Sequence, residues 1–220
     1  MTISATSSGS GGNGSNTTVV LSGVTVPAGA IIVVAVTEAS GDALLGSVSD
    51  SAGNSYSLIT SADAGGSSFY ESGIFYSTTG NALSGGSLTY TKHNGVANTA
   101  ISAVYVTGAK ASSPLDTAVT QRATGSSSAP SVTSGTPTSQ GELFIATVGW
   151  PNATLTQDSG HGWASPPAQG SSTANVAGGN QINSTAAALT FSPALGSAQS
   201  WAAFVIGFKP ATRPGMFAVL

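Results

Sequence analysis

Apolar residues in this chain come in short β-branched runs, and clusters of Gly, Pro, Asn and Ser separate these runs. The clearest run, residues 31–36 (Ile-Ile-Val-Val-Ala-Val), follows the turn-forming triplet Pro27-Ala28-Gly29 closely. A continuous run of this kind is typical of a strand that is buried on both faces. Gly, Ser, Thr and Val are poor helix formers, and Leu, Glu and Lys are too scarce for amphipathic helices. The pattern predicts an all-β protein, and no run is long enough to cross a membrane.

The second half of the chain resembles the first half. Residues 29–36 align with residues 141–148, and residues 88–91 align with residues 189–192 in the same order. An aromatic-rich strand closes each half. This order favours an ancient duplication, although short Val/Thr/Gly motifs can also recur by chance in such a composition. We expect a jelly-roll-like antiparallel β-sandwich built from two pseudo-repeats, with two small sandwiches as the other arrangement.

The composition suggests three segments along the chain. Residues 1–16 are rich in Ser and Gly and are expected to form a flexible N-terminal segment. Residues 17–210 would form a single sandwich, in which strands of pseudo-repeats 17–110 and 131–210 intercalate around one core. Residues 211–220 would leave it as an extended C-terminal arm.

Charged residues are unusually rare. The 220 residues include five Lys plus Arg and eight Asp plus Glu, which gives a net charge of −3, whereas about a quarter of an average chain is charged. Nucleic acid binding needs clustered basic residues, so we expect no nucleic acid partner. The chain has no cysteine, which excludes disulfides and thiolate metal sites. Surfaces of Ser, Thr, Asn and Gly suit packing against neighbouring subunits.

Four stretches resemble a jelly-roll-like family found in phage and phage-like particle proteins and in bacterial surface proteins. They are Asp50-Ser51-Ala52-Gly53-Asn54-Ser55-Tyr56, Ser113-Pro114-Leu115-Asp116, Gly141-Glu142-Leu143-Phe144-Ile145-Ala146 and the closing segment 201–209. The resemblance implies a non-catalytic module on an exterior surface. It implies decoration, fibre or spike roles on a virion, or carbohydrate binding and adhesion in bacteria.

The residues offer little support for catalysis or a cofactor. Asp158-Ser159-Gly160-His161 contains the three residue types of a hydrolase triad, but triad members converge from distant segments, so a polar turn explains the stretch better. Asp50, Asn54 and Asp158 occupy matching turn positions and could supply oxygens to a calcium ion, although Asx turns explain them equally well. We therefore expect neither an enzyme nor a bound cofactor.

Glycan binding is the strongest candidate for a ligand site, because aromatic faces stack on sugar rings and polar side chains bind hydroxyls. The opposing interpretation is that the tryptophans belong to the core. The candidate residues are Tyr70, Trp150, Asn152, Asp158, His161 and Trp163.

The last ten residues form the candidate assembly arm. Pro214, together with Pro210 just before the segment, keeps it extended, and it ends in the apolar sequence Met-Phe-Ala-Val-Leu. An apolar segment needs burial, either on its own sheet or by strand addition to a neighbouring subunit. The arm residues are Pro214, Met216, Phe217, Val219 and Leu220.

Together these features predict a non-catalytic structural protein on the exterior of a phage or phage-like particle. It would form homo-oligomers, contact other virion proteins and have host-surface polysaccharide as a further contact, without inserting into a membrane. The alternative is an extracellular or surface-bound bacterial carbohydrate-binding or adhesin module. A glycan-degrading enzyme is the weakest reading, because no pair of carboxylates stands out for acid–base chemistry.

Overall fold

The computed structural model describes residues 2–13, 16–39, 44–65, 70–78, 80–93, 95, 98–164, 169–170 and 174–211. Strands dominate these residues, and none of them forms a helix that is long and apolar enough to span a membrane. The strands of the first half are β1 (Ser4–Asn13), β2 (Thr18–Val26), β3 (Ile31–Ala39), β4 (Ser47–Asp50), β5 (Tyr56–Asp63), β6 (Glu71–Ser77), β7 (Leu83–Thr91) and β8 (Asn98–Thr107). Those of the second half are β9 (Leu115–Ser127), β10 (Val132–Thr133), β11 (Glu142–Trp150), β12 (Leu155–Thr156), β13 (Gln169–Gly170), β14 (Asn175–Asn183), β15 (Thr190–Phe191), β16 (Ala194–Leu195) and β17 (Gln199–Phe208). The predicted all-β class is confirmed.

Each half builds its own sheets. In the first half, a five-stranded sheet of order β1-β8-β3-β6-β5 faces a three-stranded sheet of order β2-β7-β4. In the second half, a five-stranded sheet of order β13-β14-β11-β17-β9 is covered by two small sheets, β10-β15 and β12-β16. We call the two five-stranded sheets the first and second inner sheets. All strand pairs are antiparallel.

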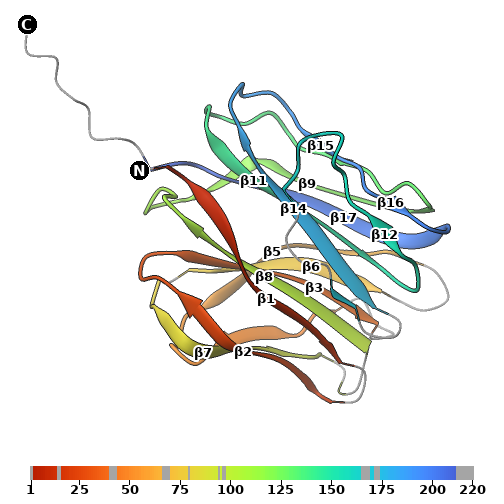
Figure 1. The fold of residues 1–220 in the computed structure, drawn as a ribbon, viewed down its shortest axis with the longest axis horizontal. Coiled ribbons are helices and arrows are strands. Elements are labelled where there is room, and N and C mark those ends of the chain that lie inside the picture. Colours follow the sequence, from red (N-terminus) through yellow and green to blue (C-terminus); the bar gives the residue numbers. More distant parts are fainter. Residues whose placement is uncertain are drawn as a thin grey trace, which may run out of the picture.

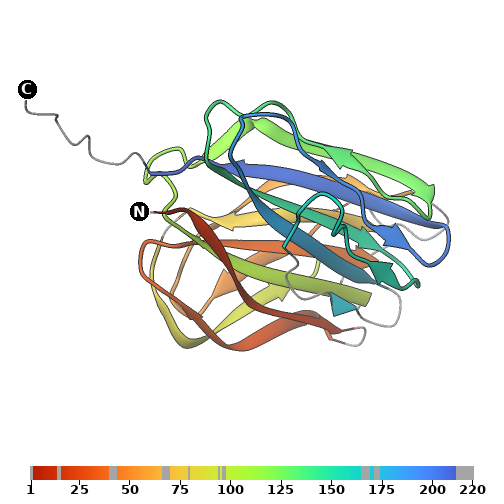
Figure 2. The same cartoon turned by 45° about the horizontal axis from the view of Figure 1, so that its top comes forward.

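The sheets stack in layers, with the two inner sheets face to face in the middle (Figure 1). Alternate residues of β3 serve different cores: Ile32, Val34 and Val36 point toward the outer sheet of the first half, whereas Val33 points toward the second inner sheet. The second inner sheet likewise packs Leu143 and Ile145 on the first inner sheet and Phe144 on its own small sheets. Figure 2 shows this layering from another side. The predicted burial of residues 31–36 on both faces is therefore correct.

The two halves share one strand order. Reading the second inner sheet from its other edge gives β9-β17-β11-β14-β13, which corresponds strand by strand to β1-β8-β3-β6-β5. Outside the inner sheets, β10 pairs with β15 as β2 pairs with β7. The aligned segments 29–36 and 141–148 thus include equivalent strands, β3 and β11. A common origin by duplication stays a prediction, but this order places β1 in the first unit and β9 in the second.

Two expectations about organisation are wrong. The predicted flexible segment 1–16 contains β1, which pairs with β8 from Ser4 to Asn13. A Ser/Gly sequence can still form a strand when a neighbouring strand takes its backbone hydrogen bonds, and the Cα hydrogen of Gly11 leaves room for the Leu21 side chain beneath it. The expected intercalation of the halves in one core is also absent from the described sheets, because every sheet draws its strands from one half.

The inner sheets can approach closely because Gly149 of β11 faces a buried hydroxyl pair on the first inner sheet. Thr37 Oγ1 and Ser72 Oγ lie 3.0 Å apart, and a Cβ atom on Gly149 would collide with both oxygens. We predict that Gly149→Ala lowers the free energy of unfolding by about 1–3 kcal/mol, because overpacking forces the layers apart. Chemical denaturation followed by tryptophan fluorescence measures this loss.

Gly160→Ala is the matched control for this substitution. The nearest atom to a Cβ at that position is an Asp158 carboxylate oxygen, 3.9 Å away. Equal stability of the two variants would contradict the close approach of the layers at Gly149.

Candidate functional site

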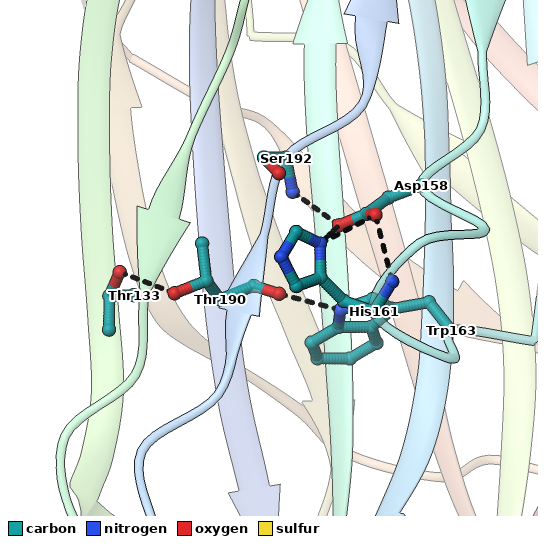
Figure 3. Close-up of polar contacts among 6 residues, drawn as sticks. All are labelled: Thr133, Asp158, His161, Trp163, Thr190 and Ser192. Carbon is teal, nitrogen blue, oxygen red and sulfur yellow. Dashed lines mark hydrogen bonds and ion pairs between the residues drawn. The ribbon is translucent and has the colours of Figure 1, made fainter.

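The predicted polar site is a loop that follows β12, and Asp158 organises it (Figure 3). The buried carboxylate of Asp158 accepts hydrogen bonds from the Ser192 amide at 2.7 Å and from the His161 amide at 3.3 Å. Nδ1 of His161 lies 2.8 Å from the same carboxylate. These contacts join the loop to the segment between β15 and β16, which is distant in sequence.

Electrostatics favours the ionised form of Asp158. Burial alone would raise its pKa, but hydrogen bonds from Ser192 and His161 and the attraction to His161 outweigh that effect. The pKa of Asp158 therefore lies below its ordinary value. The His161 side chain is 52% exposed, so the pair presents an imidazole ring at the surface with its carboxylate partner beneath it.

Trp163 anchors the end of the same loop. Its indole Nε1 donates to the Thr190 carbonyl at 2.8 Å (Figure 3). The Trp163 ring also meets the Phe191 ring edge-on, with 5.4 Å between centroids. Thr190 Oγ1 lies 2.9 Å from Thr133 Oγ1, which extends the contact to β10. Only 5% of Trp163 is exposed. A ring held in this way supports the loop and offers no face to a ligand.

The other predicted aromatic contacts are buried as well. Trp150 is 3% exposed and donates from Nε1 to the Ala153 carbonyl at 2.8 Å. Tyr70 belongs to the core between the inner sheets, whereas Trp150 and Trp163 belong to the core of the second half. Asn152 and His161 are the exposed members of the predicted set. The structure therefore joins Asp158, His161 and Trp163 in one loop, but it forms no exposed aromatic platform from the predicted residues.

The first half contains a matching carboxylate. Asp50, at the end of β4, accepts hydrogen bonds from the Ala52 and Asn54 amides, from Asn54 Nδ2 at 2.8 Å and from the Tyr56 hydroxyl at 2.6 Å. Burial would raise the pKa of Asp50, but these donors lower it below its ordinary value. In both halves one Asp thus orders a turn through protein donors. Those donors occupy the oxygens that a calcium ion would need, so the arrangement favours the Asx-turn interpretation of the motif.

The structure also brings together a buried charged cluster that the sequence analysis did not anticipate. Glu38 of β3 lies directly opposite Glu71 of β6. The Tyr90 hydroxyl from the facing sheet donates to Glu38 and accepts from the Gly46 amide at 2.7 Å. Glu38, Glu71, Tyr90 and Lys92 are each at most 5% exposed. The single signal in the sequence was an acidic residue at the end of an otherwise apolar run.

Burial and mutual interaction change the protonation of this cluster. Desolvation lowers the pKa of Lys92, and Glu38 partly opposes that effect. Desolvation raises the pKa of Tyr90, and the hydrogen bond to Glu38 raises it further, so this hydroxyl stays a donor. The paired carboxylates weaken the argument against acid–base chemistry that rested on the sequence. Both carboxylates are buried, with Glu38 0% and Glu71 3% exposed.

The equivalent positions of the second half are largely apolar. Trp150 lies opposite Asn175 as Glu38 lies opposite Glu71, and the aligned residue for Tyr90 is Phe191. One copy of the framework therefore folds without the charged cluster. This agrees with the general finding that hydrophobic residues can replace buried ion pairs without loss of stability.

A second pair of acidic residues holds the loop before β11. Asp116 accepts from the Thr138 amide and hydroxyl, and Glu142 accepts from the Ser139 amide and hydroxyl. Burial and the adjacent Asp116 raise the pKa of Glu142, whereas the hydrogen bonds outweigh burial at Asp116 and lower its pKa. This pair ties the start of β9 to the start of β11 and explains why both residues lie in stretches that the sequence analysis singled out.

Comparison with protein-family models, curated proteins and solved structures finds no match for this chain. The site must therefore be interpreted from its own geometry.

We predict that Asp158→Asn lowers the free energy of unfolding by about 1–3 kcal/mol at neutral pH, because a buried donor loses its charged acceptor. The native pKa of Asp158 is lowered, so its stabilisation is present above the ordinary Asp pKa and is lost as the pH falls through the native value. The difference between wild type and variant should shrink in acid. Denaturant titrations at a series of pH values from neutral downward measure this difference in unfolding free energy. A difference that stays constant with pH would contradict the lowered pKa of Asp158.

Tyr90→Phe tests the charged cluster. We expect a loss of about 1–3 kcal/mol, because Glu38 loses a donor and the Gly46 amide loses an acceptor. Tyr105→Phe is the matched control, since the Tyr105 hydroxyl has no hydrogen-bond partner among the described residues. If both variants unfold at the same denaturant concentration, the hydrogen bonds of Tyr90 contribute nothing to stability.

Proposed function

We propose that this chain is a non-catalytic structural protein on the exterior of a phage or phage-like particle, as a decoration, fibre or spike component. The observation that carries the proposal is the distribution of charge over the fold. Six charged side chains are buried, namely Glu38, Glu71, Lys92, Asp116, Glu142 and Asp158. Among the described charged residues, only Lys110 and Arg122 are exposed, and Asp50, Asp63 and Lys209 are half-buried.

This distribution supports an assembled role for a physical reason. Proteins that act alone in solution usually rely on surface charge to stay apart. Burying a charge in an interface carries a desolvation cost, and a surface of Ser, Thr, Asn and Gly avoids that cost. Such a surface packs against neighbouring subunits over wide areas. The resemblance of the Asp50–Tyr56 stretch and the other motifs to exterior particle proteins agrees with this role.

The proposal includes homo-oligomers and contacts with other virion proteins. Host-surface polysaccharide is an additional contact, for which the exposed Asn152 and His161 are the candidate residues. The alternative, a bacterial carbohydrate-binding or adhesin module at the cell surface, loses its expected stacking contacts, because Trp150 and Trp163 are buried. We therefore place it second.

We predict that the chain co-purifies with particles from cells that carry its gene, and that high salt does not release it. Salt resistance follows because few exposed charges are available for screening. Gradient-purified particles, washed at low and high salt and probed with an antibody, provide the measurement. A chain found in the soluble fraction at both salt concentrations would contradict the proposal.

The same preparation distinguishes the alternative. An adhesin module would bind isolated polysaccharide as a soluble monomer, and the double substitution Asn152→Ala, His161→Ala would weaken that binding. Both side chains are exposed, but His161 also contacts the buried Asp158, so circular dichroism has to verify that the variant keeps its fold.

A further inference from the structure

We propose that the open edge of β1, together with the hollow between β1 and β2, binds residues 212–220 of a second copy by strand addition. The inference rests on the proposed assembly role and names the surface and the segment that would carry it. Neither β1 nor its open edge was expected from the sequence.

β1 is an edge strand of the first inner sheet. It pairs with β8 on one side, and no other strand of the described residues lies beyond it in the sheet order. Natural proteins usually protect such edges with charged residues or proline. Ser4–Asn13 contains neither, and its single register shift lies between Ser7 and Gly9. The edge therefore presents backbone donors and acceptors over most of a ten-residue strand.

A hollow of about 290 Å³ lies beside this edge, where β1 and β2 border their two sheets. Residues 8–12 of β1 and 19–22 of β2 line it. Ser8 is the residue skipped at the register shift, and its buried Oγ has no hydrogen-bond partner among the described residues. The small side chains of β1 leave the backbone accessible, which suits a strand that binds through main-chain hydrogen bonds.

The position of the chain end supports residues 212–220 as the occupant. The Ala211 amide donates to the Gly108 carbonyl at 2.8 Å, and Gly108 lies against Thr2 and Ile3 at the start of β1. Both views show the two ends of the described chain at the same end of the molecule (Figures 1 and 2). Nine extended residues reach about 30 Å, which is close to the length of a ten-residue strand. The last five, Met-Phe-Ala-Val-Leu, are apolar and favour strand formation.

Direction favours a second copy over the same chain. A segment that starts beside Ile3 and follows the edge of its own β1 would have to run parallel to it. All strand pairs among the described residues are antiparallel, and parallel pairing is slightly less stable. A copy related by a two-fold axis can approach from the Asn13 end and pair antiparallel, and the same symmetry lets both copies exchange their segments.

The test uses the full chain, a chain that ends at Ala211 and a labelled synthetic peptide of residues 211–220. We expect sedimentation to show an oligomer for the full chain and a monomer for the shortened chain. The peptide should bind the shortened chain, as fluorescence anisotropy measures. Ser10→Lys in the shortened chain should weaken peptide binding by about tenfold or more, because a charge at the edge blocks strand pairing.

Two matched controls identify the edge and the segment. Ser126→Lys places the same charge on β9, the corresponding edge of the second inner sheet, and should leave peptide binding unchanged. A peptide with Phe217→Asp and Val219→Asp should not bind. Circular dichroism of both Lys variants verifies that they remain folded.

Three results would overturn the inference. They are a shortened chain that keeps the mass of the full oligomer, a full chain that is monomeric, and a shortened chain that does not bind the peptide. The first would indicate another interface, such as direct pairing of two β1 edges, and the second would indicate that the segment pairs within its own chain. If the peptide binds but the chain does not co-purify with particles, strand addition stands and the particle role falls. If the chain co-purifies with particles but the peptide does not bind, only the strand addition is contradicted and the particle role stands.

Discussion

The face-to-face contact of the two inner sheets is the constraint on which the rest of the structure depends. Each inner sheet has apolar residues on both faces, so neither can face water on either side. The first sheet is covered by β2, β7 and β4 and the second by the small sheets, and each half then covers the remaining face of the other. Neither half could bury its apolar surface alone, which explains why the two units form one stacked body.

Close packing of these layers also determines where small residues are needed. Gly149 has to lie against Thr37 and Ser72 without a side chain. Ala35, Ala100 and Val176 form a further contact of small and medium side chains where the halves meet. Because protein interiors are packed as densely as organic crystals, these positions tolerate little change in volume.

The charged residues form a second pattern that only the fold makes visible. Most described charges lie inside the protein, where they order turns or meet each other across strands. In the first half, Glu38 and Tyr90 occupy places that Trp150 and Phe191 occupy in the second half. The framework therefore folds with either polar or apolar residues at these positions, and the surface of each half has few charged residues. A surface of this kind, with an unprotected edge at β1, is consistent with a protein that functions among neighbours.

The sequence by itself determined the all-β class, the double burial of residues 31–36 and the turn at Asp50, because periodicity, β-branching and Asx turns act over a few residues. It also predicted correctly that Asp158 and His161 share a polar turn. It could not show that residues 4–13 form a strand, because a Ser/Gly segment has little strand preference and depends on β8 for its hydrogen bonds. The burial of Trp150 and Trp163, the pairing of Glu38 with Glu71 and the separation of the halves into their own sheets were decided by tertiary structure. Each of these features depends on which distant strands become neighbours, and no local pattern in the chain specifies that.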